Sequence, residues 1–255
     1  MGTGPADLEV SRPIPTTTPG QTLAAVVEFF RGRRLRSLGL ASFGPLDPAR
    51  GVIARNTPKA AWRGCHLQDR LAQALGVRVH TDTDVNGAAL AEGRWGVAVG
   101  RDPFLYITVG TGIGVGGFVN GGLLHGQLHP EAGHLLLPRA VGDRFAGICP
   151  IHGDCLEGLA CGPAMAARIQ SGQGEAAAVA FAVDALAKGL LNLSYTLSPH
   201  LVILGGGVMK RPGLLASVRR QMVLQNRKYV VLPKLVRPKL GDRAGVLGAL
   251  ALAGA

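Results

Sequence analysis

HPEAGHLLLPRAVGDRFAGICPIHGDCLE, residues 129 to 157, is the most specific stretch of this 255-residue sequence. It ends in a Cys-x2-His-x2-Cys run, and a further histidine lies upstream of that run. Two cysteines and two histidines are a usual tetrahedral ligand set for zinc, and two thiolates neutralise the charge of the ion. The stretch therefore predicts a zinc site with the ligands His134, Cys149, His152 and Cys155. The alternative is a loop in which these side chains occur incidentally.

Two carboxylates flank the predicted ligands. Glu131 precedes His134 by three residues, and Glu157 follows Cys155 by two. A zinc ion with four protein ligands has no coordination position left for a water nucleophile, so we expect a structural metal. By fixing the loop, such a metal also fixes Glu131 and Glu157, and we interpret it as the support of a polar pocket.

The composition describes a protein with a core of small aliphatic side chains. Hydrophobic residues make up 47% of the chain and aromatic residues only 5%, which favours one large domain or two lobes filled by Ala, Val and Leu. There is no signal-peptide pattern and no apolar run of about 18 residues, so we expect a cytoplasmic protein without a membrane partner. Cysteines that serve as metal ligands also suit a reducing compartment.

The formal net charge of +11 raises nucleic acid as a partner. The basic residues are spread widely, with the densest runs at 31–36 and 210–243. No helix-turn-helix pattern and no interleaving of basic and aromatic residues accompanies them. A solvated, Arg-rich surface is the interpretation that we favour, and we expect no nucleic-acid partner.

Strands alternate with helices from residue 36 onward, which predicts an α/β protein. Residues 1–20, rich in Thr, Pro and Gly, are expected to be weakly ordered or to lie at an edge. The predicted helices are at 22–34 with Thr22 as the cap, 67–75, 87–97, 176–198, 213–225 and 241–255. The predicted strands are at 38–42, 77–81, 104–109 and 201–204, with a further extended segment at 229–235.

A glycine-rich turn, GTGIGVGG at 110–117, follows the strand at 104–109. Two strands joined by such a turn form a hairpin, and glycines let backbone N–H groups converge on an anion. Thr111 adds a hydroxyl donor. The turn lacks the Gly-Lys-Ser/Thr of a Walker A loop and the following helix of a Rossmann unit, so alone it is weak evidence for phosphate binding. Gly205, Gly206 and Gly207 form a second such turn.

Asp84 is the candidate general base. It lies just past a predicted strand and before a predicted helix, where open α/β sheets place catalytic groups. Asp82 lies two residues earlier. Either carboxylate can instead cap the helix, since Asp is a favoured N-cap residue, and the spacing does not distinguish the two roles.

Five motifs together resemble those of the ROK family (repressor, open reading frame, kinase), most of all its bacterial fructokinase branch. SFGPLD at 42–47 and the segment 57–62 also match that branch, and the resemblance runs in collinear order from about residue 39 to 250. The five motifs are TDVNGAALAE at 83–92, YITVGTGIGVGG at 106–117, HPEAGH at 129–134, CPIHGDCLEGLACGPA at 149–164 and LGGGVM at 204–209.

The resemblance implies a ribonuclease-H-like, actin-like ATPase fold with two lobes, which we expect at residues 1–103 and 104–255. It implies a cytoplasmic homodimer that transfers phosphate from ATP, with Mg²⁺, to the O6 atom of a hexose. The implied product of the fructokinase branch is fructose 6-phosphate from D-fructose.

The resemblance also implies a role for each matching residue. Asp84 resembles the base that takes the proton of the sugar hydroxyl, and Asn86 supports the sugar nearby. The residues implied to contact sugar hydroxyls are Glu131, His134 and Glu157, with His134 binding zinc through its other ring nitrogen. The residues implied to meet the ATP phosphates or lie by the nucleotide are Gly110, Thr111, Gly112, Gly114, Pro163, Gly205, Gly206 and Gly207.

One departure from the family pattern concerns the N-terminus. ROK proteins open with a strand and an Asp/Glu-x-Gly-Gly-Thr-Lys turn, the first phosphate loop, whereas residues 1–20 resemble the sequence that follows it. We expect either a start codon upstream of the assigned one or a truncated N-terminal lobe with an unpaired strand edge. A truncated protein would be a weak kinase, or a sugar-binding or regulatory protein. A repressor of the same family would need a DNA-reading domain.

Overall fold

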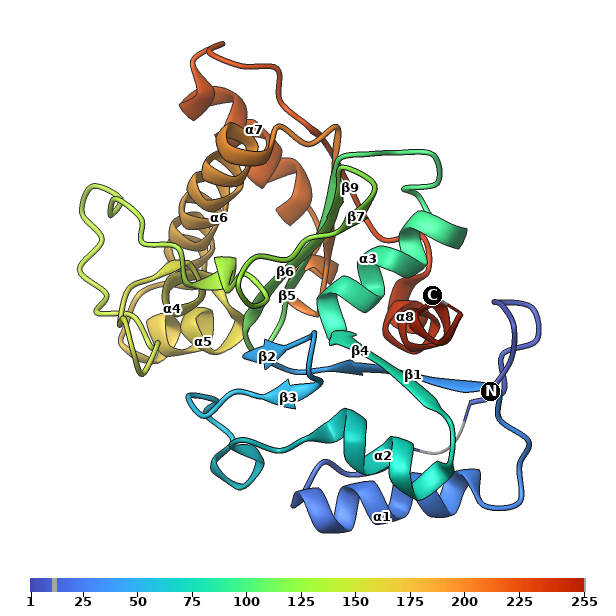
Figure 1. Cartoon of the computed structure of the whole chain (residues 1–255). Helices are drawn as coiled ribbons and strands as arrows, with labels where there is room; N and C mark the ends of the chain where they lie inside the picture. The colour runs from blue at the N-terminus through green and yellow to red at the C-terminus, as the bar shows by residue number, and fades with distance from the viewer. Residues whose placement is uncertain (11–12, 255) are drawn as a thin grey trace. The chain divides into compact units, whose positions relative to one another are not determined.

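The structure, a computed structural model, describes residues 1–10 and 13–254. The chain forms two compact units, which are described separately (Figure 1). Unit 1 consists of Met1–Val99, Leu123–Pro130 and the C-terminal segment from Asp242, and unit 2 consists of Gly100–Gly122 and Glu131–Gly241. The division into lobes at residues 103 and 104 stays a prediction.

Unit 1 contains a parallel pair of strands, β1 (Ser37–Ser42) and β4 (Arg78–Thr83). Their register places Ser37 opposite Arg78 and Ser42 opposite Thr83, so both strands end at the same edge. β4 continues without a loop into α3 (Asp84–Trp95). The short strands β2 (Leu46–Asp47) and β3 (Val52–Ile53) form a separate antiparallel pair.

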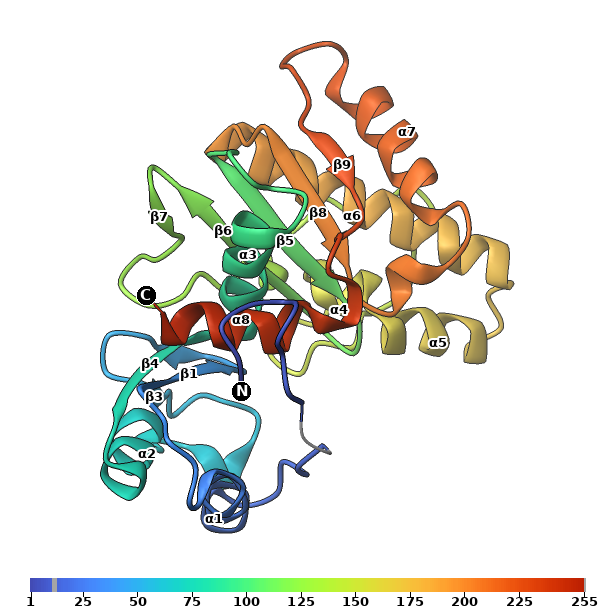
Figure 2. The same ribbon diagram turned by 90° about the vertical axis from the view of Figure 1, so that its right-hand side faces the viewer.

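Helix α8 (Ala244–Ala253) packs on both α3 and β1 (Figures 1 and 2). A Cβ atom at Gly248 would lie 2.3 Å from the carbonyl carbon of Gly87, so the two helices cross where neither has a side chain. This close approach explains the small residues of α3, because larger side chains would separate the helices. The C-terminal helix thereby supports the start of α3.

The hydrophobic core of unit 1 lies under α1 (Pro19–Phe30), α2 (Leu67–Leu75) and the 3₁₀ turn at Ala60–Trp62. The Trp62 indole N–H donates to the carbonyl oxygen of Thr17 at 2.8 Å, which satisfies its polar atom in the core. The buried members of this core are Leu23, Leu46, Ile53, Trp62, Cys65, Leu67, Leu71 and Val79.

Unit 2 is built on a five-stranded sheet in the order β7–β6–β5–β8–β9 (Figure 2). The strands are β5 (Phe104–Val109), β6 (Ile113–Val119), β7 (Gly122–Leu123), β8 (Leu201–Gly205) and β9 (Lys234–Val236). β5 pairs antiparallel with β6 and parallel with β8, and every residue of β8 is buried. The glycine-rich turns that follow β5 and β8 therefore lie at the same edge of the sheet.

The helices of unit 2 are α4 (Leu156–Ala160), α5 (Gly162–Gln170), α6 (Glu175–Leu197) and α7 (Leu214–Asn226), with 3₁₀ turns at Ala132–His134 and Val208–Lys210. α6 packs against α4, α5 and α7. Among the described residues, α6 is the one helix long and apolar enough to cross a membrane, but 56% of its most apolar window is buried in the protein. It is therefore a core helix.

The structure confirms the α/β class, the 67–75 helix and the β5–β6 hairpin, and it corrects three details. The cap of the first helix lies four residues before the expected one, because the Thr18 hydroxyl accepts the capping bond, and the helix ends at Phe30. The helix expected from residue 87 begins at Asp84, and of the extended segment 229–235 only the last part is a strand. Residues 11–12 and 255, included in two expectations, lie outside the described residues.

Candidate functional site

Four side chains of unit 2 converge to within 4.8 Å, and they are the four ligands predicted from the sequence: His134, Cys149, His152 and Cys155. Both cysteines are buried, while His152 lies at the surface. His134 Nδ1 is 3.4 Å from Cys155 Sγ and 3.6 Å from Cys149 Sγ. His152 Nδ1 is 3.8 Å from Cys149 Sγ.

These separations fit a tetrahedral metal. With Zn–S bonds of about 2.3 Å and Zn–N bonds of about 2.0 Å, a sulfur and a nitrogen ligand lie about 3.6 Å apart. Three of the four sulfur–nitrogen distances in the cluster are 3.4, 3.6 and 3.8 Å, which bracket that value. The geometry and the donor types of the cluster therefore both suit a zinc ion.

The protonation chemistry of the cluster points the same way. Burial, together with the neighbouring Cys149 sulfur, raises the pKa of Cys155 to about 11. The raised pKa favours the protonated thiol of Cys155 at neutral pH when no cation is near. A divalent ion reverses that preference and binds both sulfurs as thiolates.

Backbone hydrogen bonds fold the loop around the cluster. The Cys149 amide donates to the Gly153 carbonyl at 3.1 Å, and the Gly153 amide donates back at 2.9 Å. The Leu156 amide donates to the Leu135 carbonyl at 2.8 Å, which joins the start of α4 to the segment that carries His134. The ligands therefore come from two segments that are already hydrogen-bonded to each other.

A buried ion pair stabilises the middle of the same loop. Arg168 on α5 is fully buried and makes two hydrogen bonds to the Asp143 carboxylate, at 2.7 and 2.8 Å. Its guanidinium also lies over the rings of Phe145 and Phe181. Burial alone would raise the pKa of Asp143, but the bonds from Arg168 and the Phe145 amide hold it below its usual value. No motif in the sequence indicated this ion pair.

Glu131 and Glu157 flank the segments that carry the four clustered donors. Glu131 directly precedes the turn Ala132–His134, which packs against β6. The Glu157 Oε2 atom accepts a 2.8 Å hydrogen bond from the amide of Ile113, the first residue of β6. Both acidic residues are thus held near the start of β6, and their roles in a pocket supported by a metal stay predictions.

The glycine turns of unit 2 also come together. A Cβ atom at Gly206, where φ is +90°, would lie 2.3 Å from the Val109 carbonyl oxygen, so only glycine fits there. The Gly162 amide donates to the Gly110 carbonyl at 2.8 Å, which places the start of α5 beside the first turn. Pro163 is exposed in the first turn of α5, and Thr111 is exposed between β5 and β6.

The predicted nucleotide-binding residues differ in their settings. Gly110 and Gly112 lie in the turn, where the Gly110 amide donates to the Gly112 carbonyl at 2.9 Å. Gly114 instead lies within β6, opposite Thr108. Gly205 is the last residue of β8, and Gly207 is exposed just beyond it. The predicted residues therefore include both turn and strand positions, and of these glycines only Gly207 is exposed.

In unit 1, Asp84 is the first residue of α3 and its side chain is exposed. Desolvation raises the pKa of this carboxyl group, while the Val85 amide and the charge of Lys59 oppose the increase. The Asp84 side chain is therefore accessible to solvent, although the protein atoms around it reduce the hydration of its charged form. The cap of α3 is Thr83, whose hydroxyl accepts from the Asn86 amide at 3.2 Å, so helix capping does not account for Asp84.

Asn86 is fully buried. Its side-chain amide donates to Asp82 Oδ1 at 3.0 Å and to the Leu124 carbonyl at 3.2 Å. The predicted position beside the sugar remains a prediction, and the contacts indicate that Asn86 holds the turn at the start of α3. Sequence reasoning missed Lys59 and His125 as neighbours of this turn, because both are far from it in the chain.

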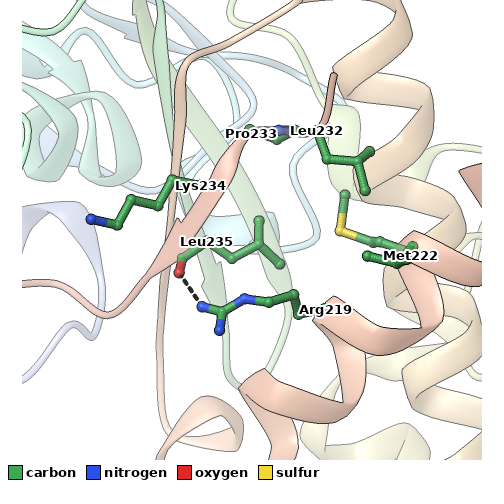
Figure 3. A pocket seen from close by; sticks show the side chains of 7 residues that line it. Arg219, Met222, Leu232, Pro233, Lys234 and Leu235 are labelled. Atoms are coloured by element: carbon green, nitrogen blue, oxygen red, sulfur yellow. Dashed lines mark hydrogen bonds between the residues drawn. The ribbon is translucent and has the colours of Figure 1, made fainter. Parts of the chain in front are cut away.

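A cavity of about 340 Å³ lies between α7 and β9 in unit 2 (Figure 3). Its lining is mainly apolar, with Met222, Leu232 and Leu235 among its side chains, and Arg219 donates to the Leu235 carbonyl at 2.8 Å beside it. None of the predicted site residues lines it. We therefore do not assign the cavity to the chemistry of the motifs.

Comparison with known proteins gives a consistent result. The model of the ROK family matches residues 6–255. A fructokinase from Zymomonas mobilis is 43% identical over 94% of this chain and 87% of its own length. A fructokinase from Pediococcus pentosaceus is 35% identical over 94% of this chain and 88% of its own length. The crystal structure of a ROK hexokinase from Thermus thermophilus is 32% identical, covers 96% of this chain and 89% of its own, and superposes with a TM-score of 0.79.

Proposed function

Because the chain belongs to the ROK family and has its actin-like ATPase fold, we propose that it is a fructokinase that phosphorylates D-fructose with ATP to fructose 6-phosphate. The observation that carries the proposal is the similarity to fructokinases, which extends over almost the whole chain. We choose fructose as the proposed substrate because the two fructokinases are more similar in sequence to this chain than the hexokinase compared above.

We assign the proton transfer to Asp84. In the proposed reaction its carboxylate takes the proton of the 6-hydroxyl group, the sugar oxygen attacks the γ-phosphorus of ATP, and ADP leaves. Phosphoryl transfer depends mainly on positioning and on charge neutralisation, which Mg²⁺ bound to ATP supplies. The raised pKa of Asp84 supports the role, because a base with a pKa nearer the working pH accepts a proton more readily.

We assign sugar recognition to unit 2 and to Asn86. Glu131, His134 and Glu157 are proposed to bind sugar hydroxyls, since a carboxylate accepts hydrogen bonds from neighbouring hydroxyl groups. Because His134 directs Nδ1 at both sulfurs, Nε2 is the nitrogen that would meet the sugar. Asn86 would support the sugar indirectly, through the turn that it stabilises.

We assign the nucleotide to the glycine turns. Their backbone amides and the Thr111 hydroxyl would bind the phosphates, and Pro163 with the Gly205–Gly207 turn would lie along the nucleotide. The residues of this assignment are Gly110, Thr111, Gly112, Gly114, Pro163, Gly205, Gly206 and Gly207.

We propose that the four-donor cluster holds a structural Zn²⁺ ion. The ion would be bound by His134, Cys149, His152 and Cys155. It would neutralise two thiolates and fix the conformation of the loop. The zinc ion would take no part in the proton transfer, which is assigned to the Asp84 carboxylate. We further propose a cytoplasmic homodimer with sugar and ATP as its small-molecule partners.

A coupled assay with ATP, Mg²⁺ and a panel of hexoses tests the function. We expect turnover with fructose to exceed that with glucose, mannose and N-acetylglucosamine, and ADP formation to depend on the sugar. Fructose binding without ADP formation would instead identify a sugar-binding or regulatory protein. Metal analysis tests the zinc, which should be present at about one ion per chain after purification without chelators.

A further inference from the structure

The segment Leu123–Pro130 packs in unit 1 against the turn between β4 and α3. Three contacts join them. The Asn86 side chain donates to the Leu124 carbonyl at 3.2 Å, His125 Nε2 lies 2.8 Å from Asp82 Oδ2, and His129 Nδ1 lies 3.4 Å from the Thr83 hydroxyl. The contact between His125 and Asp82 is the shortest of the three and includes a charged partner.

Asp82 is almost completely buried, with 4% of its side chain exposed, whereas His125 is 37% exposed. Both carboxylate oxygens of Asp82 have partners. Oδ1 accepts from the Thr83 amide at 2.7 Å and from the Asn86 side chain at 3.0 Å, and Oδ2 faces His125. Since a carboxylate only accepts, the imidazole must present an N–H at Nε2. His125 therefore completes the coordination of a buried charge.

The residues that Asp82 holds lie on either side of Asp84 in the sequence. Thr83 precedes it and caps α3, and Asn86 follows it within the first turn of the helix. The direction of the Asp84 carboxylate depends on this backbone, so a displacement of Asp82 changes where the base points. An ångström of misplacement at a reacting group is enough to slow catalysis about 100-fold.

We propose that Asp82 and His125 are positioning residues for Asp84, with His125 acting through Asp82 on the turn that carries the base. The inference rests on the proposed kinase function. It predicts an effect on turnover rather than on nucleotide affinity, because neither residue lies in the glycine turns of unit 2.

Replacement of His125 provides the test. The amide nitrogen of Gln reaches about as far as imidazole Nε2, while that of Asn reaches only as far as Nδ1. We expect His125→Ala and His125→Asn to lower kcat by about 10- to 100-fold with the KM for ATP within twofold, and His125→Gln to recover most of the rate. Asp82→Asn should lower kcat similarly, and Asp82→Asn combined with His125→Ala should be no slower than the slower single variant.

His66→Ala is the matched control. His66 also lies in unit 1 and also faces a carboxylate, Asp69, at 3.3 Å, but that pair is exposed and away from the β4–α3 turn. We expect its kcat to stay within twofold of the wild type. The comparison separates loss of a His–Asp contact in general from loss of this one.

Amide hydrogen exchange gives a readout that needs no activity. His125→Ala should speed exchange at the Thr83 and Asn86 amides and leave the α2 amides unchanged. Unchanged amide exchange or an unchanged kcat in His125→Ala would overturn the inference. A folded His125→Gln variant whose kcat is as low as that of His125→Ala would overturn it as well. If His125→Ala does not fold, the comparison of His125→Gln with His125→Asn decides. Absence of sugar-dependent ADP formation by the wild-type protein would contradict the proposed function. Amide hydrogen exchange in His125→Ala would then still test whether the contact with Asp82 holds the turn.

Discussion

At the scale of single residues, Asp84 combines two properties that a base requires. Its carboxylate is accessible, and desolvation raises its pKa above the ordinary value. The helix cap, which the sequence could not distinguish from a catalytic role, is supplied by Thr83 instead. The carboxylate is therefore not needed to begin α3, and its replacement should affect chemistry more than folding.

We predict that Asp84→Asn lowers kcat by about 10²- to 10⁴-fold, the usual contribution of a general base. A carboxyl group with a raised pKa adds stability below its ordinary pKa, and this is lost as the pH rises through the folded-state value. The variant should therefore be at least as stable as the wild type at neutral pH. Steady-state kinetics and thermal unfolding check both parts, and a fully active variant would remove Asp84 from the mechanism.

Lys59 lowers the pKa of the Asp84 carboxyl group. Its positive charge favours the ionised form, and its ammonium group also lies 3.8 Å from the centre of the Phe43 ring. We predict that Lys59→Met raises the pKa of Asp84, so that the acidic limb of the kcat/KM profile moves to higher pH. Lys59→Arg keeps the charge and should keep the wild-type profile. An acidic limb that stays in place or moves to lower pH would contradict the assignment.

At the scale of elements, the loop between β7 and α4 contains both the four-donor cluster of the proposed zinc site and Asp143, which forms a buried pair with Arg168. Removing one partner of a buried ion pair leaves an uncompensated charge, at a cost of about 3 to 5 kcal/mol. We predict a loss of this size in the unfolding free energy of Arg168→Met, measured by denaturant titration. Arg211→Met, which breaks an exposed pair with Glu175, should cost less than about 1 kcal/mol.

A smaller loss in Arg168→Met than in Arg211→Met would show that the buried pair does not stabilise the loop. The variant has a further readout, because a displaced loop also displaces the residues of the proposed zinc site. We expect its zinc affinity to fall, whereas Arg211→Met should bind zinc like the wild type. Competition with a chromogenic chelator measures that difference.

The sequence predicted those elements whose signals are local. The 67–75 helix was placed to the residue because Gly76 takes the left-handed conformation that ends it. The four-donor cluster could be predicted because three of its four residues lie within seven residues of one another. By contrast, the choice of Thr18 over Thr22 as a helix cap depended on the Pro15 carbonyl, which binds the Thr22 hydroxyl. Propensity alone could not rank two threonines.

The contacts that the sequence did not predict join distant segments. His125 and Asp82 are 43 residues apart, and Asp143 and Arg168 are 25 apart. No periodicity links such positions, because each contact depends on how two loops pack. The candidate residues were therefore predicted from motifs, whereas the side chains that hold them in place became visible only in three dimensions.

At the scale of the whole molecule, the two units divide the proposed chemistry. Asp84 and its supporting residues belong to unit 1, while the four-donor cluster and the glycine turns belong to unit 2. Leu123–Pro130 packs in unit 1, although the chain on both sides of it belongs to unit 2. The core of unit 1 is made of aliphatic and aromatic side chains together with Cys65, and none of the four clustered donors belongs to it.

This division predicts that zinc removal acts on one unit. Chelation, or Cys149→Ser, should abolish zinc binding and lower the temperature at which unit 2 unfolds, because metal binding free energy contributes to the folding of the loop. Hydrogen exchange should accelerate in residues 134–158 and stay unchanged in the strands β1 and β4.

Cys65→Ser is the matched control: Cys65 is also buried, lies in the core of unit 1 and is not part of the cluster. That variant should keep its zinc and lose stability only in unit 1. Equal acceleration in both units after chelation would mean that the metal stabilises the molecule as a whole, and a Cys149→Ser protein with a full complement of zinc would exclude Cys149 as a ligand.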